Sequence, residues 1–192
     1  MLCIARNLGQ LSFGKLMEVY REANQEHGAE LAPGEPMERQ IALSEQDFYA
    51  YLHDSFFTRP DAVYCILEEN RRYVSALRLE PYMDGLLLEA LETAPNQRQK
   101  GYAVQLIQAA QQMLEQQGSV RIYSHVSKKN FPSLKTHFHC KFEIYQDYAA
   151  YIDGSVNDRA YTLRYEKIVS EFEKSVDKSN PMVYYTLAGS ES

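Results

Sequence analysis

The chain has 192 residues, of which 45% are hydrophobic and 24% charged, so it is long enough for one domain with a sizeable core and too short for two. Its net charge of −6 argues against a general nucleic-acid or anionic-membrane binder, which would be basic. Its three cysteines are far apart without a C-x-x-C pair, and no secretory leader or membrane-spanning apolar run is visible, so we expect a cytoplasmic protein with reduced thiols.

The N-terminal third predicts one short strand followed by two helices. Residues 1–6 are apolar and indicate the strand. Ser12 is placed to cap a first helix, which we expect to end near Gly28. The stretch 44–47 resembles a capping box and predicts a second helix from there to about residue 56, with a start further upstream near Met37 as the alternative.

The middle of the chain changes to strand patterns. Residues 62–68, 73–79 and 85–93 are strand-like segments with short connections, which predicts an antiparallel meander. A polar loop over 95–101 follows, and then apolar residues at helical spacing over 102–117. Residues 119–126 form another strand-like run. Strand, helix, strand at this spacing is a crossover unit, so segments 85–93 and 119–126 should be parallel neighbours.

The C-terminal third predicts a short helix and a hairpin. Asn130 is a good helix cap, and Asn130, Ser133 and His137 share one stripe beside an apolar one; the simpler alternative is a cap with solvated neighbours. Segments 143–152 and 159–166 flank a strong Asp-Gly turn signal. Residues 181–187 are a candidate final strand, which either pairs within the domain or adds to a partner's edge.

The loop after the third meander strand contains Arg98-Gln99-Lys100-Gly101-Tyr102-Ala103, an R-x-x-G-x-A pattern. A strand followed by a basic, glycine-containing loop and a helix directs backbone N–H groups and the positive helix end at an anion. The pattern is neither a P-loop nor a dinucleotide fingerprint. It resembles the pyrophosphate-binding signature of the GNAT superfamily of acetyl-CoA-dependent acyltransferases.

A second segment strengthens this resemblance. Family members carry Asn at the start of the helix after the parallel strand and a small or hydroxyl residue three positions on, and Asn130 and Ser133 match. That helix usually ends in Tyr-x-x-x-Gly-Phe; here Phe142 is kept, His137 replaces the Tyr and Lys141 the Gly. The order of elements also resembles the GNAT fold, an α/β (α+β) mixed sheet with an antiparallel meander, a splayed parallel pair and flanking helices. We expect one domain over 1–170 and a C-terminal extension over 171–192.

The resemblance implies how acetyl-CoA would be held as co-substrate. Main-chain groups of Leu91, Glu92 and Thr93 would pair with the pantetheine arm in the gap between the parallel strands. The N–H groups of the loop and first helical turn would hold the pyrophosphate, with charge from Arg98 and Lys100; these residues are Gln99, Lys100, Gly101, Tyr102 and Ala103. Asn130 and Ser133 would face the arm or the ribose phosphate. Ordinary solvated charge is the simpler explanation for Arg98 and Lys100.

Acetyl transfer to an amine needs a proton acceptor for the amine and a proton for the leaving thiolate. Glu89 and Glu92 are the candidate bases; they are three apart, so ideal alternation puts them on opposite faces and only one could point at the substrate. His137 is the candidate acid, because neutral imidazole has one N–H to donate. The simpler role for each carboxylate is a surface charge. We expect no metal, because His137, His139 and Cys140 do not converge on a helix.

The resemblance therefore implies an N-acetyltransferase that moves an acetyl group from acetyl-CoA to a primary amine of a small molecule or peptide by direct attack on the thioester. The changes at His137 and Lys141 leave a second hypothesis, a CoA- or acyl-CoA-binding module without turnover that serves in sensing or assembly. A third is a structural α/β domain with an accidental motif. The expected partners are acetyl-CoA and an amine, with no nucleic acid and no membrane, and a homodimer is left open. The acceptor pocket would come from about residues 13–57 and 143–163.

Overall fold

The computed structural model describes residues 1–168, so the expected extension over 171–192 lies outside the described part of the chain. Its main feature is a seven-stranded mixed sheet in the order β1-β2-β3-β4-β5-β9-β6. The strands are β1 Leu2–Ala5, β2 Val63–Glu69, β3 Arg72–Tyr82, β4 Gly85–Thr93, β5 Val120–Ser127, β6 Glu143–Gln146 and β9 Ala160–Lys167. A two-stranded ribbon joins β7 Ala149–Ala150 to β8 Val156–Asn157.

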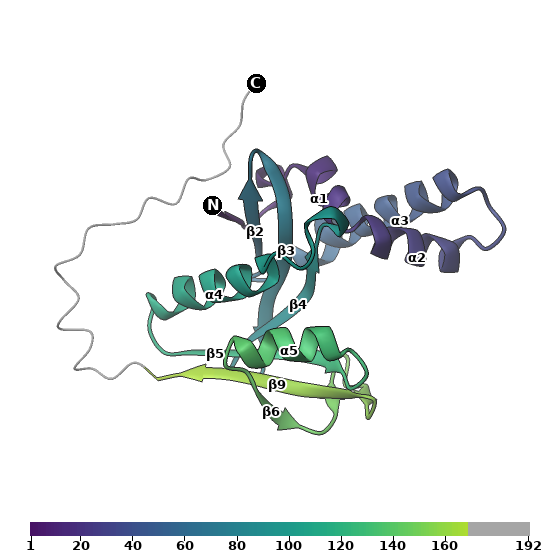
Figure 1. Ribbon diagram of the computed structural model, residues 1–192. Helices are drawn as coiled ribbons and strands as arrows, with labels where there is room; N and C mark the ends of the chain where they lie inside the picture. Colours follow the sequence, from purple (N-terminus) through teal and green to yellow (C-terminus); the bar gives the residue numbers. More distant parts are fainter. Residues whose placement is uncertain (169–192) are drawn as a thin grey trace.

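Helices cover both faces of this sheet (Figure 1). They are α1 Phe13–Val19, α2 Arg21–Leu31, α3 Met37–Tyr51, α4 Tyr102–Glu115 and α5 Phe131–His139. Short helical turns lie at Leu8–Gln10 (η1), at Leu52–Phe56 (η2, a π-helical continuation of α3) and at Pro95–Gln97 (η3). Within residues 1–168, no helix has both the length and the apolarity that a bilayer crossing requires.

Two apolar cores follow from this layering. On one face, the buried stripe of α4 packs with α5 over the centre of the sheet; its residues are Leu106, Ile107, Ala110 and Met113. On the other face, α1 and the η2 turn bury Leu16, Met17, Leu52 and Phe56 against β1, β2 and β3. The 3.6-residue periodicity of the sequence predicted the α4 stripe, and burial of that stripe is what fixes the helix to the sheet.

The meander and the crossover are confirmed. Strands β2, β3 and β4 are antiparallel neighbours, and β4 runs parallel to β5 after the crossover through α4. The C-terminal hairpin is also present, because β6 and β9 are antiparallel. Its tip is interrupted by the β7–β8 ribbon around a turn at Gly154. The topology therefore agrees with the expected mixed sheet and its single parallel pair.

The N-terminal helices differ from the prediction. The capping box at Ser44 is wrong and the alternative start is confirmed, because α3 begins at Met37. Ser44 is buried inside this helix, where its hydroxyl donates to Asn24 Oδ1 at 3.4 Å. The first helix is divided at Tyr20, and Gly28 does not end its second half. A Cβ at Gly28 would lie 2.3 Å from the carbonyl oxygen of Gln40, so this glycine permits close packing of α2 on α3.

Candidate active site

The loop between β4 and α4 presents backbone rather than side chains. Gln99 and Gly101 both have left-handed φ values, of 62° and 82°. Gly101 is the N-cap of the 14-residue helix α4, and no side chain caps this helix end. A Cβ at Gly101 would meet only the amide nitrogen of Gln105, at 3.9 Å. The first-turn N–H groups and the positive helix end therefore form an open cradle that fits an anionic group.

The charged side chains of this loop have partners within the chain. Arg98 lies 2.6 Å from the Glu22 carboxylate at the start of α2 and 3.9 Å from Glu92. The ammonium of Lys100 donates to Gln97 Oε1 at 2.8 Å, and the hydroxyl of Tyr102 donates to Glu69. Arg98 and Lys100 are both exposed, so a phosphate can compete for either cation.

Strands β4 and β5 separate after a short paired stretch. Their parallel pairing covers only Leu86–Leu88 with Ile122–Ser124. Beyond that point β4 pairs with β3 alone, through Ala76 with Glu92 and Ser75 with Thr93, while β5 remains paired with β9 as far as Ser127. The two strands thus open a V next to the α4 loop (Figure 1), and Leu91, Glu92 and Thr93 lie on its β4 side.

A bulge in β4 corrects the expectation for the two glutamates. Register between β3 and β4 shifts at Ala76/Arg78, and Ala90 has a φ of 48°. The extra residue in β4 shifts the alternation of its side chains by one position. Glu89 and Glu92 therefore lie on the same face of the sheet and not on opposite faces. Glu89 is cross-strand to Arg78 at 3.6 Å, and Glu92 lines a cavity together with Arg78. Ideal alternation failed because the bulge interrupts it.

That cavity, of about 470 Å³, lies beside the bulge on the α1–α3 side of the sheet. Its wall contains three aromatic rings, and its charged groups are two carboxylates and one guanidinium; the lining residues are Tyr20, Ala23, Asn24, His27, Ser44, Asp47, Phe48, Tyr51, Arg78, Ala90 and Glu92. The Arg78 guanidinium lies 4.7 Å from the Tyr51 ring centre. Burial raises the pKa of Glu92, with Arg98 opposing that shift. The cavity therefore joins aromatic walls to carboxylates at the edge of the V.

His125 on β5 is a candidate site residue that the sequence analysis missed. It follows Ser124, the last β5 residue that pairs with β4, just as Glu89 follows Leu88 on β4. Its ring packs edge-on against Tyr82 and Tyr151, at 5.4 and 5.1 Å. Both ring nitrogens are buried without a hydrogen-bond partner among the described residues. Burial lowers its pKa, with Glu89 opposing that shift, so the ring is neutral at pH 7. A polar residue on a buried strand was the signal available in the sequence.

On α5, the structure brings Asn130, Ser133 and His137 together as the periodicity indicated. Asn130 Oδ1 accepts the Ser133 N–H at 3.1 Å and caps the helix. The His137 ring is buried, and its Nδ1 donates to the Ser133 carbonyl at 2.8 Å. Burial lowers the pKa of His137, so this donation uses the one N–H of the neutral ring. The His137 acid stays a prediction, and this hydrogen bond weighs against it.

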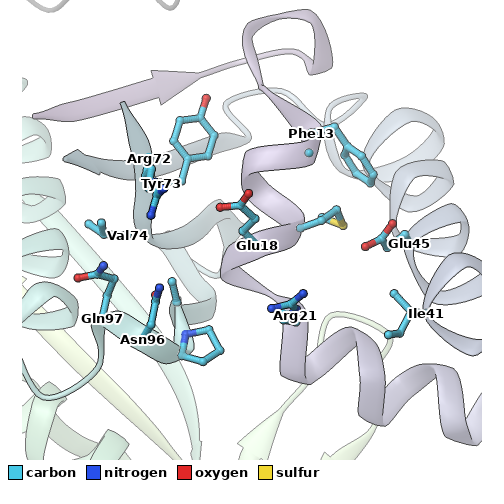
Figure 2. Close-up of a pocket in the computed structure, with 14 residues that line it drawn as sticks. Phe13, Glu18, Arg21, Ile41, Glu45, Arg72, Tyr73, Val74, Asn96 and Gln97 are labelled. Carbon is cyan, nitrogen blue, oxygen red and sulfur yellow. The ribbon is translucent and has the colours of Figure 1, made fainter. Parts of the chain in front are cut away.

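A second cavity, of about 620 Å³, lies on the other side of the α1–α2 junction. In Figure 2 the Glu18 side chain lies between Arg72 on the left and Glu45 on the right, and Asn96 and Gln97 of the η3 turn lie at the lower left. None of residues 98–103 and no part of β5 lines it. The larger cavity is therefore bounded by the first part of the β4–α4 loop, Ala94 to Gln97, and not by the start of α4 or by β5.

Comparison with known proteins agrees with this geometry. The family model described as "Acetyltransferase (GNAT) family" matches residues 16–142. No curated protein matches the sequence. Among solved structures, PaiA N-acetyltransferase from Thermoplasma acidophilum in complex with coenzyme A is similar with a TM-score of 0.56 and 14% identity, over 87% of this chain and 99% of that one.

Two further structures share the fold at similarly low identity. Ribosomal-protein-S18-alanine N-acetyltransferase from Escherichia coli has a TM-score of 0.57 and 14% identity over 88% of this chain and 96% of its own. Spermidine N-acetyltransferase from Vibrio cholerae, in complex with CoA and spermine, has a TM-score of 0.51 and 17% identity over 86% and 95%. The family model matches about two thirds of the chain, and the chain therefore belongs to the GNAT family of N-acetyltransferases, which take their acetyl group from acetyl-CoA.

Proposed function

We propose that this chain transfers the acetyl group of acetyl-CoA to a primary amine that enters from the α1–α3 face of the sheet. The observation that carries the proposal is the early end of β4–β5 pairing at Leu88 and Ser124, directly beside a helix start without a side-chain cap. The V accommodates an extended arm, and the helix start accommodates a diphosphate. Each feature alone is common, and their adjacency is what favours acetyl-CoA.

In this proposal the N–H groups of Gln99 to Ala103 bind the pyrophosphate. Arg98 and Lys100 add charge once the diphosphate displaces their present partners, Glu22 and Gln97. Main-chain groups of Leu91, Glu92 and Thr93 pair with the pantetheine arm in the V. Asn130 and Ser133 at the start of α5 lie toward the arm or the ribose phosphate.

The acceptor amine would occupy the 470 Å³ cavity, with its nitrogen at the β4 bulge and its body against Tyr20, Phe48 and Tyr51. The neighbours named above act on a protein alanine in one case and spermidine in another, so the fold itself does not select one acceptor. Two carboxylates, Asp47 and Glu92, line the cavity against one guanidinium, Arg78, and this balance favours a cationic molecule over an anionic one.

For the chemistry, we propose His125 as the proton acceptor, with Glu89 beside it. The amine nitrogen forms a bond to the thioester carbon, the carbon–sulfur bond breaks, His125 accepts the proton that the amine loses, and the thiolate takes up a proton from solvent. Neutral His125 has a free ring nitrogen on the face of the sheet that the cavity occupies, and Glu89 stabilises the imidazolium that forms. Glu92, the other candidate base, lies further along β4 and binds Arg98.

The test is thiol release from acetyl-CoA with an amine panel that includes spermidine and a peptide beginning with alanine, beside CoA and acetyl-CoA binding by calorimetry. We expect turnover with at least one amine. His125→Gln should lower kcat by about 100-fold, the lower end of general-base contributions, without changing the acetyl-CoA Kd. His53→Gln, an exposed histidine on η2, is the matched control and should behave as wild type.

The outcomes separate the hypotheses. Binding of acetyl-CoA without release of thiol for any amine would favour a CoA-binding module without turnover. No binding of either CoA or acetyl-CoA would refute the diphosphate assignment and the proposal with it. Unchanged turnover in His125→Gln would remove only His125 from the mechanism.

A further inference from the structure

Two buried tyrosines form a hydrogen-bonded chain that ends on the β4 bulge. The hydroxyl of Tyr64, on β2, donates to the hydroxyl oxygen of Tyr20 at 2.8 Å. The hydroxyl of Tyr20, at the junction of α1 and α2, donates to the carbonyl oxygen of Ala90 at 2.6 Å. Only 5% of Tyr20 and none of Tyr64 is exposed. These two hydrogen bonds thus link β2, the α1–α2 junction and β4.

The residue at the end of this chain has an unfavourable backbone conformation. Ala90 has a φ of 48°, a left-handed value that alanine rarely adopts. Such a conformation persists where the surroundings hold it, and the Tyr20 hydroxyl donates directly to the Ala90 carbonyl oxygen. The tyrosine chain is therefore well placed to select this conformation.

The peptide unit between Ala90 and Leu91 transmits this constraint to the V. A trans peptide is planar, and its C=O and N–H point in opposite directions. Because the Ala90 carbonyl points at Tyr20 on the α1 side, the Leu91 N–H is directed away from the acceptor cavity. This N–H lies three residues past the last β4–β5 pair, beside the opening between those strands.

We propose that Tyr20 is a positioning residue for acetyl transfer: its hydroxyl, oriented by Tyr64, fixes the Ala90–Leu91 peptide and so aims the Leu91 N–H at the thioester oxygen. The inference rests on the proposed function. Burial raises the pKa of both tyrosines, which keeps both hydroxyls protonated and able to donate over any ordinary assay range. The same ring of Tyr20 packs 5.4 Å from Phe48 and forms a wall of the acceptor cavity.

The experiment removes one hydroxyl at a time and keeps each ring. Tyr20→Phe and Tyr64→Phe are compared with Tyr73→Phe. Tyr73 is a matched control because it is buried in the same core, and its hydroxyl also bonds a backbone group, the Ser12 N–H, away from the bulge. The measurements are kcat, KM for acetyl-CoA, the Kd values of acetyl-CoA and CoA, and Tm.

We expect Tyr20→Phe to lower kcat by about 10- to 100-fold, as for the weakening of one preorganised donor to a developing oxyanion. Its CoA Kd should stay within about twofold of wild type, because CoA lacks the thioester carbonyl. Its preference for acetyl-CoA over CoA should fall. Tyr64→Phe should show a smaller loss of the same kind, because Tyr20 keeps its own donation to Ala90. Tyr73→Phe should keep wild-type kcat at a temperature below its Tm.

Two results would overturn the inference. One is a kcat for Tyr20→Phe equal to that of Tyr73→Phe. The other is that Tyr20→Phe and Tyr64→Phe lose activity only as far as their Tm and their CoA affinity fall, which would make the two tyrosine hydrogen bonds purely structural. If wild type releases no thiol, the proposed function fails by itself, and the ratio of acetyl-CoA to CoA affinity then decides whether Tyr20 acts on the carbonyl.

Discussion

At the scale of single residues, left-handed positions decide much of this site. Gly101 adopts its φ without a steric penalty at the start of α4, whereas Ala90 and Lys141 adopt theirs despite a Cβ. Lys141 stands where the resemblance to the family pattern predicts a glycine, and its φ of 64° is a left-handed value that glycine adopts readily. Its N–H bonds the Phe138 carbonyl to close α5. The substitution therefore changes the energy of the turn and not its shape.

Gly101→Asp should abolish binding of CoA, because a carboxylate would repel the diphosphate in the cradle. Gly101→Asn is the matched control: it has nearly the same shape, and asparagine tolerates left-handed φ better than most residues. We expect Asn to retain measurable CoA affinity and Asp to lose it, measured by calorimetry. Equal affinity in the two variants would place the diphosphate elsewhere.

Lys141→Gly should stabilise the protein by about 1 kcal/mol, because glycine adopts the left-handed turn without the penalty that a Cβ brings. Lys141→Ala removes the same charge but keeps the Cβ, so it should show no such gain. Urea denaturation measures both differences. A gain in the alanine variant as large as that in the glycine variant would show that charge, and not backbone strain, is responsible.

At the scale of elements, β4 and α5 carry the site for different reasons. The first half of β4 pairs on both sides, and its second half pairs only with β3, so one strand contributes both to the core and to the opening. Helix α5 is short, at nine residues, and depends on its ends. Asn130 supplies a side-chain oxygen at its N-terminus, and His137 donates back along the helix.

Asn130→Ala should cost about 1 kcal/mol of stability, because the Ser133 N–H loses its cap. Asn130→Asp keeps an accepting oxygen and should retain most of that stability. If Asn130 also faces the cofactor phosphates, the aspartate variant will bind CoA less tightly than wild type through charge repulsion. Denaturation and calorimetry together distinguish the two roles, and full CoA affinity in the aspartate variant would make Asn130 a cap alone.

At the scale of the whole molecule, buried titratable side chains change the stability of the fold with pH in opposite directions. Burial lowers the pKa of His125 and His137, and raises that of Glu92. As pH falls below about 6.5, the ordinary histidine value, the unfolded chain takes up protons that the folded histidines resist, so they reduce stability there. Glu92 acts in the opposite sense at lower pH, because the folded chain binds its proton first.

The free energy of unfolding should therefore fall as pH is lowered from 7.5 to 5.5. In His137→Phe this free energy should fall less steeply than in wild type. For a histidine that stays neutral in the folded state, the extra loss of stability in wild type amounts to at most about 1.4 kcal/mol over this range. Urea denaturation at each pH measures it, and the comparison cancels the contribution of Glu92. Parallel pH profiles for the two proteins would show that His137 titrates normally in the folded state.

Much of the fold was predictable because local patterns and tertiary contacts agree there. The run 85–93 is β4 with the same bounds, and the helix and strand after it were placed to within two residues. Ser44 and Gly28 failed as helix signals for a common reason: each is buried between α2 and α3, where a small residue is needed for packing, and a local pattern does not distinguish that role from a cap or a stop.

The sequence by itself determined the family, the meander with its crossover and the loop-to-helix junction at Gly101, because these depend on residues close together in the chain and on their period. Only the tertiary structure decided the facing of Glu89 and Glu92, the position of His125 beside Glu89 and the link from Tyr64 through Tyr20 to Ala90. These features depend on a bulge and on contacts between distant residues, which are 44 and 70 positions apart in the tyrosine link. No local period encodes where a strand gains an extra residue.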